Sequence, residues 1–373
     1  MTTINSNINP RLIAFYLPQF HPIIENNEWW GEGFTEWTNV GKAKKLFRGH
    51  EQPKVPSELG YYDLRMPEVR RKQADLARLH GIEGFCYWHY WFGNGKRLLE
   101  TPFNQVLETK DPDFPFCLAW ANDSWQAKLW NSEGVKINRT LQEQLYLGEK
   151  DHVDHFNTLL PSFKDPRYIR IDEKPVFLIY KPFEFPDIQD FISLWNSLAL
   201  EHGINGMHFV AQTNDIENSN ELIQMGFNSV NVVRLYDYFK FGITFKKKLF
   251  NYFKKKLLNY PSIHDYKSVS KYFSGNEDTK LNVFPSIIPN WDHTPRSGKG
   301  GLVYRNSTPE LFRKHVKDIF IKINKKPREN NLVFIKSWNE WAEGNYMEPD
   351  LKNGRQYLEV LRDELIKFNT LNE

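Results

Sequence analysis

Two glutamates, Glu340 and Glu343, lie three residues apart in the segment SWNEWAEG (337–344). An apolar run that ends at Trp338 leads directly into this pair, and Trp341 lies between the two acids. Glycosidic bonds are commonly cleaved by two carboxyl groups, one donating a proton while the other acts as base or nucleophile. Indole rings add flat apolar faces for sugar rings. The pattern predicts glycosidic chemistry, whereas the ordinary alternative is a helix start whose acids complement the helix dipole.

The elements that position these acids follow from an alternation of apolar runs and amphipathic segments, which is typical of a parallel α/β sheet or barrel. The eight strand-like runs are Leu12 to Leu17, Ile82 to Trp88, Phe116 to Ala121, Val176 to Tyr180, His208 to Gln212, Ser229 to Val233, Val283 to Ile288 and Leu332 to Trp338. The expected helices are Pro67 to Leu79, Pro186 to Glu201, Asn218 to Met225, Thr308 to Ile323 and Gly354 to Phe368.

Eight such runs in 373 residues predict an α/β fold of the (β/α)8 TIM-barrel type with enlarged βα loops. We expect residues 1–373 to form a single catalytic barrel domain, with a basic amphipathic insertion around residues 237–280. A doubly wound sheet is the alternative. However, the first run continues as LIAFYLPQFHP (12–22), without the glycine-rich phosphate loop expected there in a nucleotide-binding sheet.

Residues that act on a substrate follow the carboxyl ends of barrel strands, and polar and aromatic residues gather after most of the eight runs. The candidates for substrate binding are Tyr16, Gln19, His21, Trp88, His89, Tyr90, Asn122, Asp123, Trp125, Tyr180, Gln212, Trp291, Asp292, Trp338, Asn339 and Trp341, with Asn214 and His293 in similar positions. Trp30, Glu36 and Trp37 belong to a segment that we expect over the barrel mouth. Packing in the base of a lid is the alternative for these tryptophans. Bonding to backbone carbonyls within the core is the alternative for His21 and His89.

The overall charge favours no class of partner. The chain has 49 basic and 46 acidic residues, a formal net charge of +3, and seven lysines without an acid lie between Tyr238 and His264. The basic balance is therefore local, and no nucleic-acid partner is expected. No His/Cys/Asp spacing resembles a closed ligand set, so we expect neither a metal nor a cofactor.

Cys86 and Cys117 each lie in an apolar run, which favours buried reduced thiols. With no signal-peptide pattern at the N-terminus and no run of membrane-spanning length, these features predict a cytoplasmic protein. The segment Phe245 to Tyr260 has the pattern of an amphipathic helix with a basic face. It fits either peripheral contact with the inner membrane face, where a lipid-linked glycan would lie, or an insertion packed on the barrel.

Several long motifs resemble a known family: YLPQFHP (16–22), EWWGEGFTEWTNV (28–40), LGYYDLR (59–65), GIEGFCYWHYWF (81–92), FCLAWAND (116–123), DPRYIRIDEKPVFLIYKP (165–182) and SWNEWAEG (337–344). They are similar to the WbsX-type proteins, which are described as glycosyltransferases of polysaccharide clusters and resemble glycoside hydrolase family 99. The resemblance runs nearly end to end and is poorest at about residues 237–280.

The resemblance implies a (β/α)8 barrel, retention of anomeric configuration, no metal in the chemistry, and α-mannoside-like substrates. In family 99 the substrate's own 2-hydroxyl is the proposed nucleophile, which gives a 1,2-anhydro sugar. Carried over, Glu340 is the base on that hydroxyl and Glu343 the general acid, then base. Glu343 then needs a raised pKa, which burial against Trp341 or Trp338 could provide. One departure is Asp123, because the family pattern has Glu after the Asn at this position.

Three functions remain open at this point. The first is glycoside hydrolase chemistry on a polysaccharide or O-antigen-type glycan, whose substrate is an oligosaccharide or polysaccharide that is either free or lipid-linked. The second is a glycosyltransferase or transglycosylase of polysaccharide biosynthesis that uses the same acids. The third is a non-catalytic glycan-binding barrel. The two neighbouring carboxylates argue against it, because they repel each other and a binding module gains little from such a pair.

Overall fold

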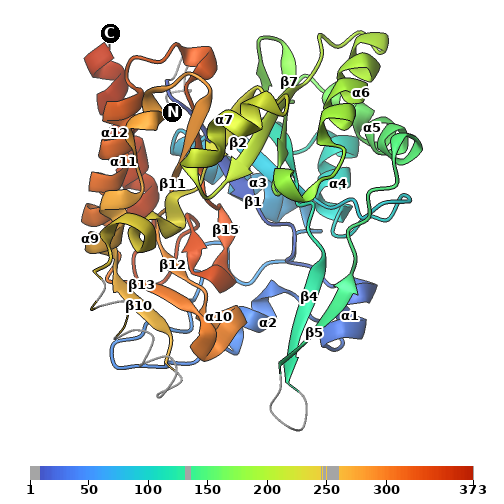
Figure 1. The fold of residues 1–373 in the computed structure, drawn as a ribbon. Coiled ribbons are helices and arrows are strands. Elements are labelled where there is room, and N and C mark those ends of the chain that lie inside the picture. Colours follow the sequence, from blue (N-terminus) through green and yellow to red (C-terminus); the bar gives the residue numbers. More distant parts are fainter. Residues whose placement is uncertain (1–8, 131–135, 245, 247–248, 250–259, 373) are drawn as a thin grey trace.

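The computed structural model describes residues 9–130, 136–244, 246, 249 and 260–372. Its centre is a closed barrel of eight parallel strands in the order β3-β2-β1-β14-β11-β9-β8-β7, and a pairing between β3 and β7 closes the ring (Figure 1). The strands are β1 (Arg11–Tyr16), β2 (Gly84–His89), β3 (Phe116–Trp120), β7 (Lys174–Ile179), β8 (His208–Thr213), β9 (Ser229–Val232), β11 (Val283–Ile287) and β14 (Leu332–Ile335). The predicted (β/α)8 TIM barrel is confirmed.

Each of the eight predicted runs overlaps one barrel strand, because a parallel strand covered on both faces must be apolar along its length. All six residues of β1 and of β2 are buried. The largest difference lies at the last run, which was predicted to reach Trp338 although β14 ends at Ile335. The chain turns there because the Ser337 hydroxyl accepts hydrogen bonds from the backbone N–H groups of Asn339 and Glu340.

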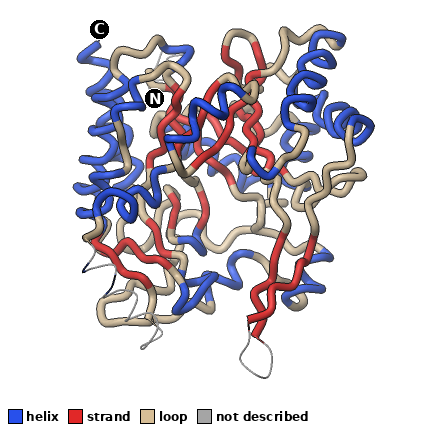
Figure 2. Tube along the Cα trace, in the orientation of Figure 1, coloured by secondary structure: helices blue, strands red, loops and turns tan. Residues whose placement is uncertain are grey.

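Helices surround the barrel in the upper half of Figures 1 and 2. The five predicted ones are present as α3 (Pro67–Leu79), α6 (Ile188–Glu201), α7 (Ser219–Gln224), α11 (Pro309–Ile323) and α12 (Gln356–Asn372). Two more, α4 (Thr101–Thr109) and α5 (Glu149–Phe163), were not predicted. In α5 the buried face includes Asp151, His152 and His155 and the helix contains Pro161, so its sequence lacks a purely apolar stripe.

The loops after the carboxyl ends of the strands are enlarged and form the lower half of the molecule in Figure 1. They contain α1 (Ile24–Trp30), α2 (Glu36–Gly41), the antiparallel hairpin β4 (Trp125–Trp130) and β5 (Lys136–Gln142), α10 (Thr294–Ser297), and the short pair β15 (Asn339–Glu340) and β16 (Asn345–Tyr346). The hairpin was not predicted. Near the opposite end of the barrel, β6 (Arg170–Ile171) pairs with β7.

The predicted insertion around residues 237–280 contributes a strand to a small sheet that is separate from the barrel. Its strand β10 (Ser262–Asp265) joins β13 (Leu302–Arg305) and β12 (Trp291–Asp292) in a three-stranded sheet, followed by α9 (Tyr266–Val269). Residues of this sheet and of α9 belong to a second small apolar cluster, which includes Tyr266, Phe273 and Tyr304. Most of the segment Phe245 to Tyr260 lies outside the described residues. Across the part of the chain that is described, no helix has the length and apolar character to span a bilayer.

Gly84, the first residue of β2, illustrates how tightly the barrel packs. A Cβ atom added there would lie 2.4 Å from the Pro115 carbonyl oxygen and 2.8 Å from Ile169 Cδ1. We therefore predict that Gly84→Ala lowers the free energy of unfolding by about 1–3 kcal/mol, the usual cost of overpacking. Urea unfolding measures this. Gly41→Ala is the matched control, because no atom lies within 4 Å of its added Cβ, and an equal loss in both variants would contradict the explanation.

Candidate active site

The loop after β14 carries both glutamates to the carboxyl end of the barrel. Glu340 ends β15, and a 3-10 turn, Trp341–Glu343, brings Glu343 to the same side. Gly344 then reverses the chain in the left-handed conformation, at φ 54°, and a Cβ on it would lie 2.7 Å from Asp292 Cβ. A residue with a side chain would be strained in conformation and would clash with Asp292, so glycine is needed here.

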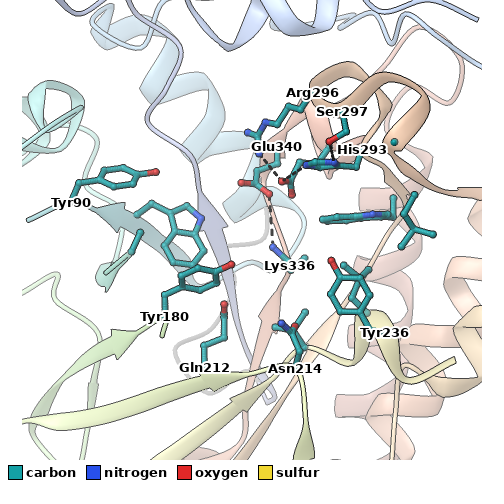
Figure 3. Close-up of a pocket in the computed structure, with 18 residues that line it drawn as sticks. Tyr90, Tyr180, Gln212, Asn214, Tyr236, His293, Arg296, Ser297, Lys336 and Glu340 are labelled. Carbon is teal, nitrogen blue, oxygen red and sulfur yellow. Dashed lines mark hydrogen bonds and ion pairs between the residues drawn. The ribbon is translucent and has the colours of Figure 1, made fainter. Parts of the chain in front are cut away.

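Both carboxyl groups line a pocket of about 520 Å³ at the carboxyl ends of the strands. Figure 3 shows Tyr90 and Tyr180 on one side of it, Tyr236 on the other, and Gln212 with Asn214 along a third edge. Nine residues that the sequence singled out line this pocket: Trp88, Tyr90, Tyr180, Gln212, Asn214, Trp291, His293, Glu340 and Glu343. The predicted pair and an aromatic wall therefore do meet in one cavity.

Two cations approach the acids. Arg296, from α10, donates through Nη1 to Glu343 Oε1 at 2.6 Å and through Nε to Glu36 Oε1 at 2.8 Å. Lys336 Nζ lies 3.8 Å from Glu340 Oε2 and 5.8 Å from the centre of the Trp291 ring. Arg296 thus bridges two carboxylates with short bonds, while the contact of Glu340 with its cation is longer than a hydrogen bond.

The pKa directions of the pair are opposite to those that the resemblance implied. Burial raises the pKa of Glu340 above its usual range, and the neighbouring charge of Glu343 raises it further. Burial alone would also raise the pKa of Glu343, but Arg296, a hydrogen bond with Glu340, Lys336 and His293 together lower it below its usual value. The surroundings of the pair therefore favour a proton on Glu340 and a charge on Glu343, and the roles that the resemblance implies stay a prediction.

Three candidates near the pair are buried behind the pocket instead of lining it. Trp341 Nε1 donates to Glu348 at 2.6 Å and its ring stacks on Tyr346. Asn339 bonds both backbone groups of Leu17, at 2.8 and 3.0 Å. Trp338 is fully buried. Their side chains hold the loop in place, so their positions support a structural role and not substrate contact.

Three further candidates are engaged in bonds away from the pocket, and a fourth, His21, is buried with no hydrogen-bond partner for either ring nitrogen among the described residues. Tyr16 donates to Gln73 at 2.7 Å, and His89 Nε2 lies 2.8 Å from the Nε2 of buried His155. Asp292 accepts from Gln52 and Thr294 and pairs with His50. His21 is buried beside Pro18 and Asp63. For His89 the partner is a second histidine and not the backbone carbonyl that the alternative interpretation invoked.

The remaining candidates lie around the mouth. Asn122 bonds Tyr146 and the backbone of Lys181, and Asp123 pairs with the Lys181 ammonium at 3.1 Å. Trp125, on β4, packs against Tyr90, Phe92 and Trp29. Trp37 packs between Phe20 and Trp341, and the Gln19 carbonyl accepts from the N–H of Glu36. Trp30 is exposed at 45%. The packed-lid alternative thus describes Trp37 well.

Arg296, Lys336 and Tyr236 line the pocket but were missed from the sequence. Lys336 follows β14 directly, so the strand-end rule would have found it if applied to cations as well as to acids and aromatics. Tyr236 follows β9 by four residues. Arg296 lies beyond β12 in a short helix, and no local sequence signal connects it with Glu36 or Glu343.

A family model described as "Glycosyltransferase WbsX" matches residues 12–361. The chain belongs to the WbsX family. Two relatives from Xanthomonas campestris pv. campestris, each described as an uncharacterized protein WxcX, are 32% identical over 98% of this chain (strain B100) and 33% identical over 95% (strain ATCC 33913). This WbsX-family chain spans about half the length of both, 51% and 50%.

Among solved structures, the fold of this WbsX-family chain is similar to that of the GH99 endo-alpha-mannosidase from Bacteroides thetaiotaomicron, in complex with BIS-TRIS-propane. The TM-score is 0.59 at 15% identity, covering 98% of this chain and 99% of that one. A second structure of that enzyme gives a TM-score of 0.58, also at 15% identity, over 98% of this chain and 100% of that one. These likenesses establish a shared barrel architecture.

Glu348, behind the loop that carries Glu340 and Glu343, offers a test of the site's electrostatics. Burial raises its pKa from 4.5 to about 7, because its carboxylate is held only by the neutral donors Trp341, Gln73 and Tyr62. Between these two pH values the folded chain keeps a proton that the unfolded chain has lost, so the free energy of unfolding falls as pH rises. We predict that Glu348→Gln reduces this fall by about 3 kcal/mol.

Urea unfolding at a series of pH values measures the slope. Glu359→Gln, at an exposed position on α12, is the control and should leave the pH dependence of stability as in the parent chain. The same slope in Glu348→Gln and the parent chain would mean that Glu348 is ionised in the fold at these pH values.

Proposed function

We propose that this WbsX-family chain is a glycan-processing enzyme that acts on a glycosidic bond by glycosidase-type chemistry, with Glu340 and Glu343 as the catalytic pair. The observation that carries the proposal is the meeting of these two buried, interacting carboxyl groups in one pocket with an aromatic wall. One carboxyl protonated and the other ionised is the combination that acid and base catalysis of glycoside cleavage requires.

The pocket supports a sugar substrate. Trp88 and Tyr180 lie edge to face and present ring surfaces to the cavity, and Tyr90 and Trp291 also line it. Gln212 Nε2 is bonded to Asn231 at 2.9 Å, which directs its carbonyl oxygen as an acceptor for a hydroxyl. We propose an oligosaccharide or polysaccharide as the substrate class. A lipid-linked form, membrane contact and a cytoplasmic location remain predictions from the sequence.

The mechanism that we propose follows the resemblance to glycoside hydrolase family 99. Anomeric configuration is retained, the substrate's 2-hydroxyl attacks the anomeric carbon, and a 1,2-anhydro sugar forms. Glu340 accepts the hydroxyl proton, and Glu343 donates a proton to the leaving oxygen, then activates water. The glycosyltransferase or transglycosylase alternative is favoured by the family's own description. In it, an acceptor hydroxyl replaces water in the second step, and the same glutamates act.

The test is product analysis with a panel of α-mannosides and bacterial-type oligosaccharides, with and without sugar nucleotides. We expect release of sugar without a nucleotide and with retained configuration. Glu340→Gln and Glu343→Gln should each lower the rate by roughly 10²–10⁴-fold, the usual contribution of a general acid or base. Glu359→Gln, at an exposed position, is the control. Transfer that occurs only with a sugar nucleotide would overturn the hydrolase proposal in favour of the transferase.

A further inference from the structure

The pocket and the adjoining residue Glu36 together hold more acids than permanent cations. Three carboxyl groups, those of Glu36, Glu340 and Glu343, lie within ion-pair distance of two permanent cations of the described residues, Arg296 and Lys336. Uncompensated charge is costly where side chains are shielded from water, so such a site reaches neutrality most readily by keeping one proton on a carboxyl group. The question is which of the three acids holds it.

Glu36 is one of the two acids that accept a short hydrogen bond from Arg296. It lies in α2, at the barrel mouth, and its side chain is only 1% exposed. Arg296 Nε is 2.8 Å from its Oε1, and among the described residues no other cation forms an ion pair with Glu36. Glu36 therefore fixes the guanidinium in place, and the planar fork of that group directs Nη1 to Glu343.

Glu343 receives the second short bond of the same guanidinium, at 2.6 Å, with His293 Nε2 3.6 Å away. Glu340 is less well compensated. Its Oε2 is buried, has no hydrogen-bond partner among the described residues, and lies 3.8 Å from Lys336 (Figure 3). A carboxylate bonded to a guanidinium holds its negative charge much more readily than one that faces a distant ammonium.

We propose that Glu36 and Arg296 form a positioning pair that keeps Glu343 ionised and leaves the site's single proton on Glu340 until a substrate binds. This inference rests on the proposed function of the two glutamates and deepens it. The opposite pKa directions of Glu340 and Glu343 agree with it. The other titratable groups that face Glu343 are His293, Tyr180 and Tyr236. Burial, and then the charge of Glu343, raises the pKa of both tyrosines, which therefore stay neutral.

The resting state then differs from the reactive state by one proton transfer. The O–H bond of Glu340 breaks and an O–H bond forms on Glu343, the interacting carboxyl group beside it. Glu340 is left ionised, ready to accept the proton of the substrate's 2-hydroxyl, and Glu343 carries the proton for the leaving oxygen. A substrate hydroxyl that donates to Glu340 stabilises that distribution, so the site is activated by the group on which it acts.

A substrate-free titration tests the inference. We would follow the side-chain carboxyl carbons of ¹³C-glutamate-labelled chain by NMR and assign them with Glu340→Gln, Glu343→Gln and Glu348→Gln. We expect Glu340 to titrate above Glu343. Arg296→Gln should raise the pKa of Glu343 by about 1–3 units, the effect of one nearby opposite charge. Glu36→Gln keeps the arginine but removes the group that positions it, so it should also raise the pKa of Glu343, by less than Arg296→Gln does. Arg296→Lys keeps the charge and should retain much of the low pKa of Glu343.

Arg313→Gln is the matched control. It breaks an arginine–glutamate bond of similar length, 2.7 Å to Glu364, far from the pocket between α11 and α12, and should leave both titrations unchanged. If Arg296→Gln does not fold, the order of titration in the parent chain and the Glu36→Gln result still decide. Glu343 titrating above Glu340, or Glu36→Gln leaving the pKa of Glu343 unchanged or lowering it, would overturn the inference. The titration needs no substrate, so a failure of the activity panel would count against the proposed function alone.

Discussion

Closure of the barrel through the β3–β7 pairing is the constraint on which the site depends. In the closed ring the carboxyl ends of eight strands surround one space, so Trp88 at the end of β2, Gln212 at the end of β8 and Lys336 after β14 become neighbours. An open sheet would spread the same residues along an edge. The fully apolar strands that make closure stable, such as β1 and β2, leave the chemistry to the loops. The barrel therefore sets where side chains can meet, and the loops set which ones do.

The pKa values of the glutamates in this region are shifted in opposite directions although they share one side-chain type. Glu348 is surrounded by neutral donors, so desolvation dominates and its pKa is raised. Glu343 is equally shielded from water, yet the guanidinium of Arg296 outweighs desolvation and the pKa is lowered. The identity of the partner at hydrogen-bond distance therefore decides the charge state. This is why a loop with three nearby acids, Glu340, Glu343 and Glu348, presents only one that is held as an anion by an arginine.

The sequence predicted the barrel well because buried parallel strands leave a continuous apolar signature, and each of the eight runs overlaps a barrel strand. It predicted the site less completely. The chain turns at Ser337, so the alternation of the strand does not continue into the loop, and Glu340 lines the pocket while Trp338 and Asn339 pack behind it. Arg296 reaches Glu36 across 260 positions of the chain, and no local pattern encodes such a contact. Helix α5 was not predicted because its buried face carries His152 and His155, which count as polar residues in a hydrophobic pattern.

The departure at Asp123 affects the rim of the site and leaves its centre intact. Asp123 pairs with Lys181, beyond the end of β7, and that ammonium also binds Glu184. Neither Asp123 nor Lys181 lines the pocket that contains the two catalytic candidates. A shorter side chain at this position therefore alters the approach to the pocket, where more distant parts of a glycan would pass. Differences in substrate between this chain and GH99-like barrels are thus expected to arise at the mouth, from loops such as the β4–β5 hairpin, while the proposed catalytic pair stays as it is.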